Sequence, residues 1–174
     1  MPVRAALVMI SCMKVTALPA NKLLLAHFCV ILLISALTRN LAIAMPEDPW
    51  TAAQVVQPAQ LVIELQQEKD RHVLIIYVGV RTLFNGGHIP GAVYYGPGSA
   101  EQGISDLKKY AATLPKNADV VLYCGCCPLE KCPNLRPAFT ALKDLGLARL
   151  RVLILPTSFN TDWAEKGYPV QKSS

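Results

Sequence analysis

Three short apolar runs beyond residue 70 constrain the fold more than any other feature of the sequence. His72–Val78, Asp119–Tyr123 and Arg151–Leu155 are rich in Val, Ile and Leu and show little alternation of polar and apolar residues. Such runs are typical of strands buried on both faces of a parallel sheet. A shorter run at Ala92–Tyr95, closed by Gly-Pro-Gly, predicts a further strand.

Segments with helical periodicity alternate with these runs. We expect helices at Pro58–Lys69, Gln102–Leu114 and Leu135–Leu145, because apolar residues recur three or four positions apart in each. Gly146, directly after the last segment, is a typical helix stop. The alternation favours one α/β domain whose parallel sheet is covered by helices on both faces.

The first 44 residues predict a secretory signal peptide. They contain four basic residues and no acidic residue. Leu23–Leu37 is an apolar stretch of 15 residues, shorter than the ~20 that span a membrane. Ala42–Ala44 then supplies a small-x-small cleavage sequence. We expect an exported protein, periplasmic or secreted, that loses residues 1–44 and keeps no stable membrane span. An uncleaved N-terminal anchor is the alternative.

Loss of the signal peptide changes the charge and the cysteine content. The full chain has 17 basic and 12 acidic residues, a net charge of +5. Cleavage would leave 13 basic residues against the same 12 acidic ones, a net charge of +1. No run of Lys and Arg remains, so we predict that the protein does not bind nucleic acid. Cys12 and Cys29 leave with the signal peptide.

The remaining four cysteines all lie in one loop after the run Asp119–Tyr123. The loop reads CGCCPLEKCPN over residues 124–134 and contains Cys124, Cys126, Cys127 and Cys132. Ligands of open α/β sheets bind beyond the carboxyl ends of the strands, which is where this loop is expected. The helix that follows presents unpaired backbone N–H groups and its positive end. A thiolate in the loop should therefore have a lowered pKa.

Four motifs between Ala59 and Gln171 resemble the rhodanese (thiosulfate sulfurtransferase) family. They are HIPGA at 88–92, VVLYC at 120–124, LGL at 145–147 with the following Val152-Leu153, and Trp163 with GYPV at 167–170. The resemblance implies a rhodanese-like domain at 59–171, preceded by a leader at 45–58. It also implies a central parallel sheet of about five strands. Within the motifs, His88, Gly91 and Trp163 are expected to have structural roles.

The resemblance also implies a sulfurtransferase. In that family a cysteine thiolate takes a sulfane sulfur from a donor such as thiosulfate, becomes a persulfide, and passes the sulfur to a thiol or another thiophile. Cys124 occupies the position of this cysteine and is the predicted nucleophile. Backbone amides of a tight loop can stabilise its thiolate or persulfide. We expect no cofactor and no metal; the expected partners are a small sulfur donor and a thiol acceptor.

The sequence departs from the family pattern around the predicted site. The cysteine loop is longer than in the family and carries three additional cysteines. The acidic residue of the family's Asp-Val-Arg is Gly79 here, and the family's Gly-Gly before the tryptophan is replaced by Pro156–Asn160. These changes argue against ordinary transfer from thiosulfate to cyanide. Three basic residues are candidates for binding an anionic donor: Arg81, Lys131 and Arg136.

The cysteine cluster leaves four interpretations open. Cys124 can transfer sulfur while Cys126, Cys127 or Cys132 resolves its persulfide. The Cys-x-x-Cys spacing of Cys124 and Cys127 also suits a redox-active disulfide. The four cysteines can instead bind zinc or an iron–sulfur cluster, or form two structural disulfides. The alternative function is therefore a non-catalytic or thiol-redox-sensing rhodanese-like module whose loop cysteines form disulfides or bind metal.

Overall fold

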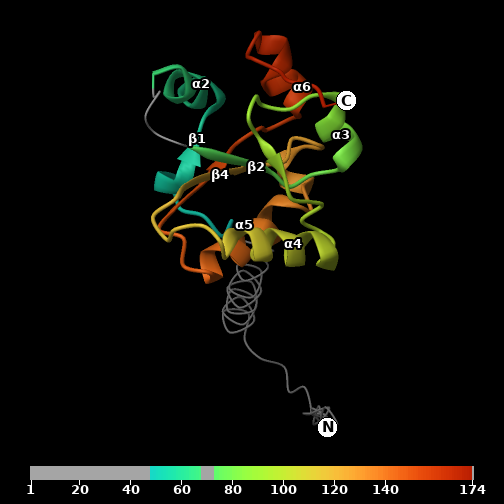
Figure 1. Cartoon of the computed structure of the whole chain (residues 1–174). Helices are drawn as coiled ribbons and strands as arrows, with labels where there is room; N and C mark the ends of the chain where they lie inside the picture. Colours follow the sequence, from blue (N-terminus) through green and yellow to red (C-terminus); the bar gives the residue numbers. More distant parts are fainter. Residues whose placement is uncertain (1–47, 68–72, 174) are drawn as a thin grey trace, which may run out of the picture. The chain divides into compact units, whose positions relative to one another are not determined.

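Five parallel strands form the centre of the fold, in the order β1-β5-β4-β2-β3 (Figure 1). The computed structural model describes residues 48–67 and 73–173, so the predicted signal peptide lies outside the described residues. The strands are β1 (Val55–Val56), β2 (Leu74–Tyr77), β3 (Val93–Tyr94), β4 (Asp119–Tyr123) and β5 (Arg149–Leu153). The predicted α/β class and the parallel sheet of about five strands are confirmed.

Helices cover both faces of this sheet, as predicted. In Figure 1, α4 (Glu101–Ala111) and α5 (Leu135–Asp144) lie below the sheet, and α2 (Pro58–Gln67), α3 (Arg81–Gly86) and α6 (Phe159–Asp162) lie above it. The described residues also form the 3-10 turns η2 (Ala52–Gln54), η3 (Leu129–Lys131) and η4 (Ala164–Lys166). Among the described residues, no helix is long and apolar enough to cross a membrane.

Successive strand residues belong to two different hydrophobic cores. Ile76 and Leu122 pack on the face covered by α4 and α5, whereas Ile75 and Val121 pack on the opposite face. All four side chains are at most 2% exposed. Burial on both faces explains why the strand sequences lack the alternation of a half-exposed sheet. Cys124, just after β4, belongs to the core under α4 and α5.

The segment expected as a leader contributes to the folded domain. Within it, β1 pairs with β5 at the edge of the sheet, with Val55 opposite Val152. Trp50 is 8% exposed and packs edge-on against Phe139 of α5, with ring centroids 5.4 Å apart. Two strand residues and a single tryptophan have no periodicity that would distinguish them from a loop. The structured part therefore begins before residue 59.

β5 begins and ends two residues earlier than the predicted run Arg151–Leu155. Arg149 and Arg151 are strand residues because acidic partners neutralise them. Asp119 accepts from both, at 2.7 Å from Arg149 and 2.9 Å from Arg151. Arg151 also pairs with Glu64 of α2 at 2.8 Å. The predicted run began at Arg151 and left Arg149 out, whereas the fold supplies acidic partners for both arginines from β4 and α2.

Candidate functional site

The cysteine loop begins at the carboxyl edge of the sheet, between the loops that follow β2 and β5. Val78 N–H donates to the carbonyl of Tyr123 at 2.9 Å, which ties the chain after β2 to the end of β4. Gly125 has a φ of 71°, a conformation that favours glycine. Its carbonyl accepts from Phe159 N–H at 2.8 Å. A Cβ on Gly125 would lie 2.8 Å from side-chain atoms of Leu155 and Phe159, so only glycine fits this turn.

The loop brings the four predicted cysteines into one cluster of sulfur atoms. Cys124 Sγ lies 3.1 Å from Cys126 Sγ, which lies 3.5 Å from Cys127 Sγ. The sulfurs of Cys124, Cys126 and Cys132 all lie within 4.8 Å of one another. Cys124 and Cys132 are buried, at 2% and 5% exposed, whereas Cys126 and Cys127 are half-buried. All four are free thiols in the structure.

Asn134 holds two of these sulfurs and was not identified from the sequence. Its side chain is 3% exposed. Nδ2 donates to Cys124 Sγ at 3.6 Å and to Cys126 Sγ at 3.5 Å, while Oδ1 accepts from Ser99 N–H at 3.0 Å. Asn134 is the N-cap residue of α5, yet its side chain does not cap the helix. An asparagine directly before a helix is a typical N-cap signal. This signal is compatible with the place of Asn134 before α5, but it gives no indication that the side chain contacts sulfur.

Replacing Asn134 by alanine is expected to destabilise the fold by about 1–3 kcal/mol, because the Ser99 N–H loses its acceptor. Urea unfolding of reduced protein measures the difference. Asn85→Ala is the matched control: Asn85 is exposed in α3, so its loss should change stability by less than ~0.5 kcal/mol. Equal effects of the two substitutions would contradict the bracing role of Asn134.

Cys132, and not Cys124, is the cysteine whose pKa is lowered. The pKa of Cys132 falls to about 5. The largest cause is hydrogen bonding from the Cys124 thiol, and the backbone N–H groups of Asn134 and Leu135 lower the pKa further. Burial of Cys132 acts in the opposite direction. The same hydrogen bond, followed by burial, raises the pKa of Cys124. The backbone N–H groups at the start of α5 thus act on Cys132 rather than on Cys124, the predicted nucleophile.

A thiolate on Cys132 is therefore expected in the reduced protein at neutral pH. Its pKa is lowered from the ordinary 9.0 to about 5, so the thiolate is present above this range and is lost as the pH falls through it. Ultraviolet thiolate absorbance measured against pH tests this, and Cys132→Ser should remove the absorbance at pH 7. A wild-type protein that forms no thiolate until the pH approaches 9 would contradict the assignment.

A pocket of about 500 Å³ opens beside Cys126. It lies between α3, the cysteine loop and the segments around and after α6. Leu83, Phe159 and Val170 give it apolar walls, and among the described residues that line it Lys172 is the one cation. Cys126 lines this pocket, whereas Cys124 does not. Cys126 therefore lies between the pocket and the buried sulfur of Cys124.

Tyr77 occupies the space that an acidic side chain at position 79 would need. A Cβ on Gly79 would lie 2.5 Å from Tyr77 Oη and 3.0 Å from Cys124 Sγ. Burial first, and then the nearby Cys124 and Cys126, raise the pKa of Tyr77. The phenol therefore stays neutral at the inner wall of the pocket, where the family pattern has an aspartate. The replacement removes one negative charge from the surroundings of the thiols.

The three predicted anion-binding residues are not brought together. Arg136 donates to Asp48 at 2.8 Å and to the carbonyl of Leu129 at 3.0 Å, and so braces the loop. Lys131 is exposed at the end of η3. Neither residue, nor Arg81, lines the pocket beside Cys126. Their binding of an anionic donor stays a prediction without support from the pocket.

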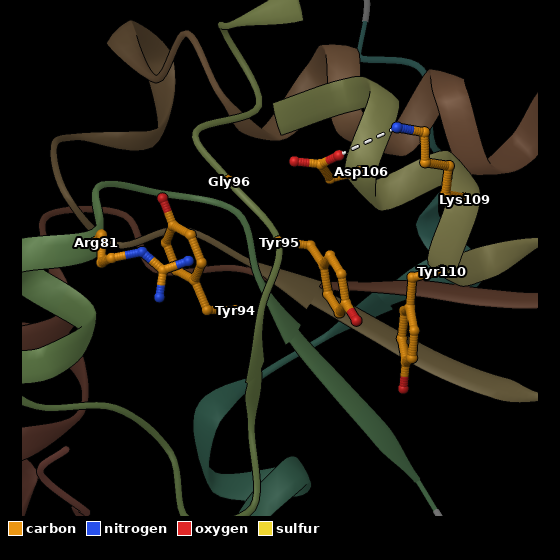
Figure 2. A pocket seen from close by; sticks show the side chains of 7 residues that line it. All are labelled: Arg81, Tyr94, Tyr95, Gly96, Asp106, Lys109 and Tyr110. Atoms are coloured by element: carbon orange, nitrogen blue, oxygen red, sulfur yellow. Dashed lines mark ion pairs between the residues drawn. The ribbon is translucent and has the colours of Figure 1, made fainter. Parts of the chain in front are cut away.

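Arg81 lines a different pocket, of about 470 Å³ (Figure 2). Its guanidinium lies over the ring of Tyr94, 3.8 Å from the centroid. On the other side of the pocket, the rings of Tyr95 and Tyr110 stack with centroids 4.2 Å apart. No cysteine lines this pocket. The contact with Tyr94 therefore gives Arg81 a packing role on the α3 side of the sheet edge.

The motif residues His88, Gly91 and Trp163 lie where structural roles are expected. His88 is 2% exposed, and its ring stacks on Phe84 at 3.9 Å. Gly91 has a φ of 77°. Trp163 is fully buried, and its Nε1 donates to the carbonyl of Pro169 at 2.8 Å. None of the three lines the pocket beside Cys126.

Comparison with known proteins identifies the fold. No family model and no curated protein matches the sequence. The solution structure of a rhodanese-like domain from Anabaena sp. is 22% identical and covers 68% of this chain and 79% of its own, with a TM-score of 0.50. A crystal structure of the same Anabaena protein is also 22% identical, with a TM-score of 0.52, and the match covers 68% of this chain and 92% of the Anabaena chain. A crystal structure of a Bacillus halodurans protein is 16% identical, with a TM-score of 0.54, and the match covers 88% of this chain and 87% of the Bacillus chain.

These likenesses define the chain as an open parallel α/β domain of the rhodanese-like type. The resemblance found in the sequence motifs is thus confirmed at the level of the fold. At such identities the likeness concerns the fold alone, so the chemistry of the chain has to be argued from its own cysteine loop.

Proposed function

We propose that the protein is a sulfurtransferase that carries a sulfane sulfur as a persulfide on Cys124. The observation that carries the proposal is the position of Cys124, which follows β4 directly at the carboxyl edge of the sheet, is 2% exposed, and has its sulfur within 4.8 Å of the sulfurs of Cys126 and Cys132. Asn134 adds an N–H donor to the Cys124 sulfur at 3.6 Å. A rhodanese-like fold with a cysteine at this position supports the same chemistry.

Cys132 serves Cys124 as a proton acceptor. The pKa of Cys132 is lowered and that of Cys124 is raised, so in this proposal the proton of the reduced pair starts on Cys124. Transfer of this proton to Cys132 generates the Cys124 thiolate, the nucleophilic form of cysteine. Because the two sulfurs lie within 4.8 Å of each other, the proton has only a short distance to move inside the buried site. The Asn134 amide then donates to the new thiolate.

The sulfur then moves in two displacements. The Cys124 thiolate attacks the outer sulfur of the donor; an S–S bond forms to Cys124 while the donor's S–S bond breaks, and the donor leaves as a thiolate, or as sulfite from thiosulfate. The acceptor thiolate next attacks the outer sulfur of the persulfide. That S–S bond forms as the bond to Cys124 breaks, and Cys124 takes back the proton from Cys132.

The pocket favours an organic persulfide over thiosulfate as the donor. Leu83, Phe159 and Val170 offer apolar contact to the organic group, while Lys172 is the one cation among its described lining residues. A dianion such as thiosulfate would lose hydration there with little compensation. The donor must also displace the Cys126 side chain, because Cys124 is only 2% exposed.

A donor panel tests the proposed function. Reduced, metal-free protein is incubated with thiosulfate or with a thiol persulfide, and with a thiol acceptor; transferred sulfur is measured. We expect turnover, with the thiol persulfide used better than thiosulfate. Turnover with neither donor would contradict a sulfurtransferase and would favour the module described next.

The second candidate is a thiol-redox module, and the short contact between Cys124 and Cys126 favours it. Their sulfurs, 3.1 Å apart, need to approach by about 1 Å to form a disulfide of normal length. A redox module would close this bond reversibly and transfer no sulfur. Counting free thiols after equilibration in dithiol buffers of known potential, beside the turnover measurement, separates the two functions.

We also propose that the protein is exported, on the pattern of residues 1–44. N-terminal sequencing of the protein from cell fractions is the test. We expect to find, in the periplasm or the medium, a mature chain that begins at Met45. A chain that keeps Leu23–Leu37 and sediments with membranes would instead indicate an uncleaved anchor.

A further inference from the structure

We propose that the cysteine loop is also a binding site for one Cu(I) ion, held by the sulfurs of Cys124, Cys126 and Cys132. These three atoms lie within 4.8 Å of one another, and they form the one such group of potential metal ligands among residues 48–67 and 73–173. The inference rests on this geometry and does not depend on sulfur transfer. It replaces the sequence-based expectation that the protein binds no metal.

The spacing of the sulfurs suits a single ion. With metal–sulfur bonds of about 2.3 Å, three sulfurs around one ion lie about 4.0 Å apart. Cys124 and Cys126, now 3.1 Å apart, would separate by under ~1 Å to reach this spacing. The common iron–sulfur clusters take four cysteines spread over two or four irons, which does not suit three sulfurs grouped around one point. Soft thiolate ligands select Cu(I) or zinc among the ions that bind singly.

The number of ligands favours Cu(I) over zinc. Structural zinc is almost always bound by four ligands. The fourth sulfur, of Cys127, is 3.5 Å from Cys126 but lies outside the group of three that are mutually close. Three sulfurs suffice for a trigonal Cu(I) ion. Cys124 and Cys132 are buried, which shields the reduced ion from water.

The surroundings also suit metal-bound thiolates. Asn134 Nδ2 lies 3.6 Å from the Cys124 sulfur and 3.5 Å from the Cys126 sulfur, and its amide oxygen is fixed by Ser99 N–H. N–H donors of this kind orient ligands and spread the negative charge of a thiolate site. Cys126 borders the pocket of about 500 Å³, which gives an ion a route to the buried sulfurs. A bound ion would occupy Cys124 and so block sulfur transfer.

Titration of the reduced full chain with Cu(I), against a coloured Cu(I) chelator and without any sulfur donor, tests the site. We expect one Cu(I) per chain and an ultraviolet thiolate-to-copper band. Cys132→Ser and Cys126→Ser should each weaken Cu(I) binding at least ~100-fold, because each removes a ligand of the ion. Loss of a residue that only hydrogen-bonds to a ligand typically weakens binding less than this. Circular dichroism checks that both variants fold. Cys127→Ser is the matched control and should change the affinity less than ~3-fold, since its sulfur lies outside the trigonal set.

Three results would overturn the proposal: no Cu(I) retained against the chelator, binding unaffected by Cys132→Ser and Cys126→Ser, or zinc held more tightly than Cu(I) and lost with Cys127→Ser. The last result would indicate a tetrahedral zinc site instead. Because sulfur transfer is measured on metal-free protein and copper binding without donor, either activity can fail while the other stands.

Discussion

Replacing Cys124 by serine is expected to lower sulfur transfer at least ~10³-fold, the scale seen when an enzyme loses its nucleophile. A serine hydroxyl forms no persulfide, and none of the other cysteines occupies the position directly after β4. The measurement is turnover with a thiol persulfide as donor, together with the sulfane sulfur that remains bound to the protein. Both should fall to the background of the buffer.

Two further variants keep this result interpretable. Cys124→Ala removes the hydroxyl, which excludes an effect of a new buried polar group, and should be equally inactive. Cys126→Ser should still form a persulfide on Cys124, because Cys126 separates Cys124 from the pocket without carrying the sulfur. If Cys124→Ser retained bound sulfur while Cys126→Ser lost it, Cys126 would be the carrier and the assignment would be wrong.

Replacing Trp163 by alanine is expected to destabilise the fold by about 3–5 kcal/mol. Its side chain is fully buried and stacks on Phe159, with centroids 6.3 Å apart, and meets Tyr168 edge-on at 5.2 Å. Alanine would leave a cavity between the sheet and the C-terminal segment. It would also remove the hydrogen bond from Nε1 to the carbonyl of Pro169.

The free energy of unfolding in urea measures this effect. Trp163→Phe should lose less than Trp163→Ala, because a ring still fills the site although the hydrogen bond is gone. Leu83→Ala is the surface control: Leu83 is 51% exposed on α3, and surface changes alter stability by ~0.5 kcal/mol or less. A loss below ~1 kcal/mol for Trp163→Ala would show that the segment after α6 is not part of the cooperative core.

The sequence predicted the long elements well because their patterns are local. The strand at Asp119–Tyr123 was predicted with its observed limits, and the helix that begins at Leu135 was predicted to within one residue of its end. α3 was missed because its six residues, RTLFNG, include no apolar repeat. Elements of this length are fixed by contacts from other elements, here the packing of Phe84 against Tyr77 of β2 and Tyr94 of β3, with ring centroids 5.5 and 5.6 Å away.

The candidate site was predicted in its location but not in its electrostatics. Spacing placed four cysteines in one loop, yet it could not show that Cys132 takes the backbone N–H groups of α5 while Cys124 points into the core. Arg136 was a candidate for binding substrate because it flanks the cysteine loop, and the sequence did not reveal its partner Asp48, which lies 88 residues earlier in the chain. Such long-range partners decide charge and exposure, and a local pattern contains no information about them.

The most direct test of the central claim is to locate the transferred sulfur on the protein. Reduced protein receives less than one equivalent of a thiol persulfide, is alkylated, and is cut by trypsin. Cleavage after Lys131 separates Cys132 from the peptide that holds Cys124, Cys126 and Cys127. Fragmentation within that peptide should place the mass of one sulfur atom on Cys124. Sulfur found mainly on Cys126, Cys127 or Cys132, or on none of them, would contradict Cys124 as the carrier.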